Sequence, residues 1–157
     1  DAVVANYVVH HLARPEIVFS EVCRVLRANG RFAFAVWGAP EEQSSISAFF
    51  GAVETLLDLG DLPHGPLFGV IERSVYEPML EQAGLEQPYL EVHEMNWETE
   101  SLDPVIRGFW DWGNMASLPK ELQDKVEVST RENAQPYEQN GGFVFPHSAL
   151  VGRAIKK

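Results

Sequence analysis

Two stretches decide the fold of this chain: Asp1-Ala-Val-Val-Ala-Asn-Tyr-Val-Val-His-His-Leu12 and Glu21-Val-Cys-Arg-Val-Leu-Arg-Ala-Asn-Gly-Arg-Phe-Ala-Phe-Ala-Val-Trp37. The apolar run from Ala2 to Val9 is rich in β-branched residues, which is typical of a strand buried on both faces of a parallel sheet. Arg31 to Trp37 form a second such run, and Pro15 opens a helical pattern between the two. Strand, helix and strand in so short a span predict one βαβ unit.

The rest of the chain continues this α/β pattern. Asn29-Gly30 predicts a left-handed cap at the end of the first helix, and Gly84 predicts the end of a later one. Apolar periodicity and breakers predict helices over Ser45–Leu59, Glu72–Ala83, Leu102–Met115 and Lys120–Tyr137, a loop over Gly60–Gly69, an edge strand over Pro88–Trp97, and a last strand over Phe143–Ile155 that is interrupted around Pro146-His147.

Composition narrows the class of protein. The 157 residues are 45% hydrophobic and 22% charged, which is the balance of an ordinary globular domain. A formal net charge of -11 repels phosphate backbones, so we expect no nucleic-acid partner. No apolar run approaches the roughly 20 residues of a membrane helix, so we expect no membrane association. Cys23 is the only cysteine, which excludes an internal disulfide and favours the reducing cytoplasm.

The two opening stretches resemble the fourth strand, the following helix and the fifth strand of class I S-adenosylmethionine (SAM)-dependent methyltransferases. In that family the strand begins with an Asp and ends near a His-His-Leu, and the helix ends in Arg-Val-Leu-(Arg/Lys)-Pro-Gly-Gly. Here Ala28 replaces the proline, Asn29 replaces one further residue of the turn, and Arg14 stands where an Asp often caps the helix. These changes weaken the turn and the cap locally.

The resemblance continues to the C-terminus. Tyr76-Glu-Pro-Met-Leu-Glu-Gln-Ala-Gly-Leu85 is similar to the helix before the sixth strand. Gly142-Phe-Val-Phe-Pro-His-Ser-Ala-Leu-Val-Gly-Arg-Ala154 looks like the closing strand of ubiquinone/menaquinone-biosynthesis-type relatives, which also carry a helical insertion like the one at about 102–138. The resemblance implies the C-terminal half of a Rossmann-like sheet, with a parallel strand-helix-strand unit, an antiparallel final strand pair, and one partial domain over 1–157.

The family binds SAM at a glycine-rich turn after its first strand, where glycine permits close approach of the backbone. No such turn follows a strand in this sequence. We therefore expect the SAM-binding N-terminal half to be absent, and the isolated chain to be inactive and to bind SAM poorly.

Ligands of open α/β sheets bind beyond the carboxyl ends of the strands. By resemblance, Asn6 and Tyr7 lie beside the methionine portion of SAM, and His11 lies near the reacting face. His10 or His11 could supply a base if the methyl acceptor must lose a proton. The alternative is that a histidine only caps or packs the loop. We expect no metal site, because adjacent histidines point apart and no H-E-x-x-H or cysteine cluster accompanies them.

Several aromatic residues could line a pocket for the acceptor. Trp37, Phe49 and Phe68 are candidates, together with Trp110 in the predicted insertion, because ligand pockets are mostly apolar and often aromatic. Trp110 belongs to an aromatic patch with Phe109, Trp112 and Met115. The alternative is that these aromatics are ordinary core residues, as aromatics at helical spacing usually are.

Two hypotheses of function remain. The first is SAM-dependent methyl transfer to a small molecule. The second is a non-catalytic oligomerisation or binding module derived from a methyltransferase, because an exposed first strand with Val3, Val4, Val8 and Val9 would pair with another chain and form a homodimer. A nicotinamide-dependent oxidoreductase shares the architecture, but the sequence contains neither a dinucleotide fingerprint nor a Tyr-x-x-x-Lys motif.

Overall fold

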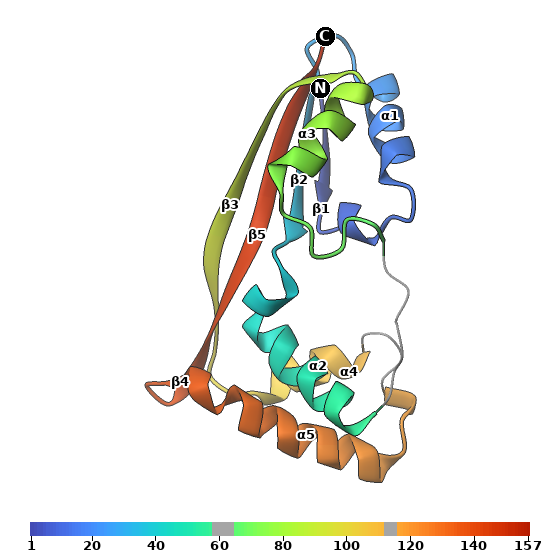
Figure 1. Cartoon of the computed structure of the whole chain (residues 1–157). Coiled ribbons are helices and arrows are strands. Elements are labelled where there is room, and N and C mark those ends of the chain that lie inside the picture. Colours follow the sequence, from blue (N-terminus) through green and yellow to red (C-terminus); the bar gives the residue numbers. More distant parts are fainter. Residues whose placement is uncertain (58–64, 112–115) are drawn as a thin grey trace. The chain divides into compact units, whose positions relative to one another are not determined.

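The computed structural model describes residues 1–57, 65–111 and 116–157, and its chain divides into two compact units. Unit 1 comprises residues 1–39, 63–94 and 148–157, and unit 2 comprises residues 40–62 and 95–147. Figure 1 shows the elements of both units, and each unit is described below by itself. In chain order they are β1 (Ala2–Asn6), the 3-10 turn η1 (Val9–His11), α1 (Pro15–Val25), β2 (Arg31–Trp37), η2 (Pro40–Glu42), α2 (Ser44–Leu56), α3 (Arg73–Gln82), β3 (Leu85–Thr99), α4 (Asp103–Asp111), α5 (Lys120–Ala134), η4 (Gln135–Tyr137), β4 (Glu138–Gln139) and β5 (Gly142–Lys156).

The sheet has the strand order β1-β2-β5-β3, and β4 pairs with β5. β1 and β2 are parallel, with Val4 opposite Ala33, whereas β2 and β5 are antiparallel, with Phe34 opposite Gly152. The predicted α/β fold class, with a parallel strand-helix-strand unit and an antiparallel closing pair, is thus confirmed. The edge position predicted for the strand with Pro88 is also confirmed.

The core of unit 1 lies between the sheet and the helices α1 and α3, which Figure 1 shows along one face of the strands. Alternate residues of β2 point into this core, so Phe32, Phe34 and Val36 are buried. The Phe34 ring covers Gly152 on the neighbouring strand so closely that a Cβ at Gly152 would collide with it. A glycine is therefore required in the middle of β5.

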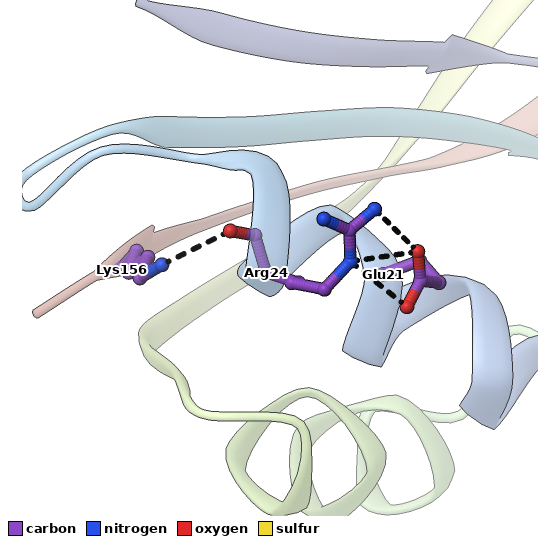
Figure 2. A network of polar contacts seen from close by, with 3 residues as sticks. All are labelled: Glu21, Arg24 and Lys156. Atoms are coloured by element: carbon purple, nitrogen blue, oxygen red, sulfur yellow. Dashed lines mark hydrogen bonds and ion pairs between the residues drawn. The ribbon is translucent and has the colours of Figure 1, made fainter.

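The carbonyl groups at the end of α1 are bound by the last strand. The Lys156 ammonium donates to the Leu26 carbonyl oxygen at 2.8 Å and to that of Arg24 at 3.5 Å (Figure 2). The Arg24 guanidinium donates in turn to the Glu21 carboxylate one helical turn earlier. A cation at this place satisfies carbonyls that have no partner within the helix, and it also complements the helix dipole.

Unit 2 is mainly helical. Its core contains α2, α4 and α5, and Phe49 of α2 packs against Phe109 and Trp110 of α4 with ring centroids 5.1 Å apart in both pairs. The Trp110 indole N–H donates to Glu127 on α5 at 3.2 Å, so this partly buried donor is satisfied. The predicted insertion at about 102–138 includes α4 and α5. None of the described helices has the length and apolarity that crossing a membrane requires.

The structure corrects several predicted bounds. β1 ends at Asn6 rather than continuing to Val9, because Tyr7 adopts a left-handed backbone conformation with φ of 51°. α5 ends at Ala134, and the last predicted turn, Gln135–Tyr137, is the 3-10 turn η4, where Pro136 lacks the N–H that an α-helix would need. The other predicted helix ends at Leu59 and Met115 lie outside the described residues, and β3 begins earlier than predicted, at Leu85.

The interruption predicted at Pro146-His147 is wrong, because β5 runs without a break from Gly142 to Lys156. The ladder between β2 and β5 ends at Ala149. Pro146 lies beyond that ladder, so its missing N–H removes no bond to β2.

Candidate functional site

The carboxyl ends of the parallel strands β1 and β2 meet in unit 1, where the candidate site begins. Tyr7 follows β1 directly, and its backbone N–H donates to the Ala35 carbonyl oxygen of β2 at 2.9 Å. The Tyr7 ring stacks on Trp37 at the end of β2, with ring centroids 4.0 Å apart and planes at 26°. Partial burial raises the pKa of the Tyr7 phenol, so the phenol stays neutral at physiological pH.

The next turn, η1, carries two histidines in different environments. His10 is 1% exposed, and neither of its ring nitrogens has a hydrogen-bond partner among the described residues. Burial, with the neighbouring His11 as a smaller cause, lowers the pKa of His10 to about 4, so its imidazole is neutral at pH 7. The His11 ring is exposed, with its centroid 4.0 Å from that of His10.

A second segment of unit 1 closes over this turn. A Cβ at the buried Gly65 would lie 2.6 Å from the Leu12 carbonyl oxygen and 2.7 Å from that of His10, so only glycine allows the approach. Phe68 follows, partly exposed at 39%, with its ring centroid 6.2 Å from that of His10 and 6.4 Å from that of His11. Chain segments more than fifty residues apart in sequence therefore build one small region.

The structure groups the predicted site residues unevenly. Tyr7 contacts Trp37, and His10 and His11 contact Phe68, all within unit 1, where Asn6 is exposed at the end of β1. Phe49 and Trp110 belong to the core of unit 2, where they are 0% and 8% exposed. Phe109 lies in the same core, and the rest of the predicted aromatic patch, Trp112 and Met115, lies outside the described residues.

Sequence reasoning missed a buried polar network in unit 2. His147 Nδ1 lies 2.7 Å from Gln43 Oε1, and His147 Nε2 lies 3.0 Å from Ser45 Oγ. All three residues are at most 4% exposed, and burial lowers the pKa of His147. Ser44 Oγ also donates to the Pro146 carbonyl oxygen at 2.7 Å. About a hundred residues separate the partners, and no sequence spacing joins them.

This network has the connectivity of a hydroxyl, a base and an orienting amide. Ser45 is only 1% exposed, however, so a substrate has no access to its hydroxyl. The arrangement joins the beginning of α2 to β5 by satisfied buried hydrogen bonds, which makes it a structural element of unit 2. Among the residues that the structure describes, no group of three or more His, Cys, Asp or Glu side chains could hold a metal ion.

Comparisons with known proteins relate the beginning of the chain to a known family. Residues 1–34 match the family model of a methyltransferase domain, and this stretch contains β1, η1, α1 and the first half of β2. No curated protein matches the sequence.

Two solved structures share the fold. A putative methyltransferase from Bacillus halodurans aligns over 99% of this chain with a TM-score of 0.51 and 22% sequence identity. The YcgJ protein from Bacillus subtilis aligns over all of it with a TM-score of 0.50 and 20% identity. The chain spans 63% and 64% of the length of these two proteins. The resemblance to class I methyltransferases is therefore confirmed in sequence over residues 1–34 and in fold over nearly the whole chain, whereas the ubiquinone/menaquinone subgroup stays a prediction.

Proposed function

We propose that this methyltransferase-like chain serves SAM-dependent methyl transfer to a small molecule, at the carboxyl ends of β1 and β2. The observation that supports this most directly is the position of the methyltransferase-family match. It covers the strand, the His10-His11 turn and the helix that form this end of the sheet. In open α/β folds this is the end where ligands bind.

The side chains at this end fit part of SAM. When bound, SAM supplies an electrophilic methyl group on a positively charged sulfonium. The stacked Tyr7 and Trp37 rings offer aromatic faces that attract a cation, and the exposed Asn6 amide offers both a donor and an acceptor. No G-x-G-x-x-G-like sequence follows a strand in this sequence. We therefore propose that the 157-residue chain alone binds SAM weakly and does not complete turnover.

The two histidines have different proposed roles. His11 is exposed and can exchange a proton with water, so it is the better base for an acceptor that must lose a proton during methyl transfer. His10 is held neutral by burial and is therefore a poor base. It is only 1% exposed and does not reach an acceptor, so its proposed role is to pack the turn that carries His11.

The acceptor is proposed to be a small molecule with an apolar part. Phe68 beside the two histidines and Trp37 at the end of β2 are the aromatic residues of unit 1 that support this. A lining role for Phe49 and Trp110 stays a prediction, since both are core residues of unit 2.

Calorimetric titration of the chain with SAM, and separately with S-adenosylhomocysteine, tests the proposed site. The proposed site is supported if SAM binding is saturable and Tyr7→Ala weakens it. The control variant His93→Ala, at an exposed histidine of β3, should leave the binding unchanged. If binding occurs but Tyr7→Ala and Asn6→Ala do not affect it, the site lies elsewhere. Absence of saturable binding would contradict the proposal that this chain binds SAM at all.

A homodimer formed through β1 is the second candidate function. In the described part of the chain β1 pairs only with β2, and Val4 on this strand is 71% exposed. An apolar edge strand favours pairing with another strand. Light scattering across a concentration series should then show a dimer that Val4→Lys weakens and that Val128→Lys, at a 59% exposed valine of α5, leaves intact. A monodisperse monomer would contradict this proposal.

A further inference from the structure

The sheet has a second open edge, which the proposed methyl transfer does not use. β3 stands at the opposite end of the strand order from β1 and is hydrogen-bonded only to β5 among the described strands. Within unit 1 every β3 residue from Glu91 to Glu94 is exposed, so the strand is open on both faces as well as along its edge. Unpaired backbone groups on an edge strand are a template for strand addition.

Side chains on this edge combine apolar surface with negative charge. Tyr89 and Val92 are 46% and 44% exposed. Glu91 accepts a hydrogen bond from the Tyr89 hydroxyl at 2.8 Å, and Glu94 is exposed two positions beyond Val92, on the same side of the strand. Tyr89 also interacts with a cation within unit 1, because the Arg153 guanidinium carbon lies 4.9 Å from its ring centroid.

The charges on the two edges favour different partners. β1 contains no charged residue from Ala2 to Asn6, so two copies can approach along it without repulsion. Pairing of β3 with a second β3 would bring Glu91 and Glu94 of both copies together, in a chain whose net charge is already -11. Like charges opposite each other destabilise strand pairs, whereas opposite charges stabilise them.

We infer that the β3 edge from Tyr89 to Glu94 binds an extended cationic segment of a partner protein by strand addition. Lysine or arginine side chains of that segment would pair with Glu91 and Glu94, and its apolar side chains would cover Tyr89 and Val92. The inference does not depend on the proposed methyl transfer. Because β1 and β3 lie at opposite ends of the strand order, a chain that pairs with β1 leaves β3 open.

The first experiment measures binding of short labelled peptides to the whole chain by fluorescence anisotropy. A peptide with lysines placed opposite Glu91 and Glu94 and valines placed opposite Tyr89 and Val92 is expected to bind saturably, and the same peptide with glutamate in place of lysine is not. N-methylation of alternate residues in the basic peptide should abolish binding, because it removes the N–H groups that a new strand must donate.

Paired variants separate the site from the overall charge. The double variant Glu91→Gln/Glu94→Gln should weaken binding about tenfold. Its control, Glu54→Gln/Glu132→Gln, changes two exposed carboxylates of unit 2 and alters the net charge equally, so it should leave the affinity nearly unchanged.

Any one of four results would overturn the inference. If both double variants lose the same affinity, the attraction is due to net charge rather than to β3. If the N-methylated peptide binds as well as its parent, no strand is added. If neither peptide binds, the carboxylates only protect the edge from pairing. If the chain dimerises through β3 and Glu91→Gln/Glu94→Gln strengthens that dimer, the partner is a second copy of the chain.

Discussion

His10 and His147 are both buried, and burial lowers the pKa of both, yet their surroundings differ. His147 has a hydrogen-bonding side chain at each ring nitrogen, whereas the ring nitrogens of His10 have no partner among the described residues. A satisfied buried imidazole contributes to the fold, and an unsatisfied one reduces stability unless a ligand provides the missing bonds. The difference makes His147 a stabilising residue of unit 2, whereas the burial of His10 in unit 1 is not offset by hydrogen bonds from the described residues.

Removal of the His147 side chain should produce the largest effect. His147→Ala leaves a cavity and takes the partner away from two buried groups, so we expect a loss of about 3 kcal/mol in the free energy of unfolding. Urea denaturation at pH 7 measures it. His93→Ala, at an exposed histidine of β3, is the matched control and should change stability by less than about 0.5 kcal/mol. If both variants lose the same free energy of unfolding, His147 has no special structural role.

The pH dependence of stability tests the His10 side of the comparison. The pKa of His10 falls from 6.5 to about 4 in the folded chain, so the unfolded chain binds more protons between these values. His10 therefore favours folding above pH 6.5, and the chain should lose up to about 3 kcal/mol as the pH falls from 6.5 to 4.

The variant His10→Phe isolates this effect. It should be as stable as the parent at pH 7, because it replaces a buried imidazole that has no hydrogen-bond partner among the described residues by a ring of similar size, and it should lose less stability on acidification. Urea midpoints at several pH values provide the measurement. Unchanged pH dependence in His10→Phe would mean that other groups cause the acid sensitivity, His147 among them.

Gly65 tests how closely the second segment must approach His10. In Gly65→Ala the added Cβ would crowd the His10 and Leu12 carbonyl oxygens, so we expect a loss of about 2 kcal/mol in the free energy of unfolding. Outside the backbone of α4 itself, no atom of the described residues lies within 4 Å of a Cβ added at Gly108, so Gly108→Ala should instead stabilise the chain by about 0.5–1 kcal/mol. Thermal unfolding of both variants measures the two changes in stability. If both variants are more stable than the parent, the approach at Gly65 is not tight.

The fold was predictable to the extent that its signals are local. Apolar runs gave β1, β2 and their parallel pairing, and Asn29 does adopt the left-handed conformation expected at the end of α1. The early end of β1 was not predictable, because Val8 and Val9 continue the apolar pattern while Tyr7 reverses the backbone. The continuity of β5 through Pro146 was not predictable either. It depends on where the ladder with β2 ends, and the sequence of β5 alone does not contain that information.

The candidate site was likewise predictable only where its residues are close together in the sequence. Asn6, Tyr7, His10 and His11 follow one strand, so a sequence reading can place them together. The Tyr7–Trp37 stack requires the register of β1 against β2, and the closure of Gly65 over His10 requires tertiary packing. His147 joins Gln43 and Ser45 across about a hundred residues, so a single sequence contains no signal for that network.

The smallest effect is the coupling within the His147 network, measured by a double-mutant cycle at Gln43 and Ser45. Ser45→Ala alone should lower the free energy of unfolding by about 1 kcal/mol, since it removes one buried hydrogen bond. If the two residues act through the same imidazole, the double variant should lose about 0.5–1 kcal/mol less than the sum of the single losses. Thr55 lies about three turns further along the same helix and its hydroxyl donates to the Gly51 carbonyl oxygen at an exposed position, so a cycle between Gln43 and Thr55 should be additive. Additivity in both cycles would mean that each partner binds His147 independently, so that its contrast with His10 rests on two separate hydrogen bonds and not on a coupled network.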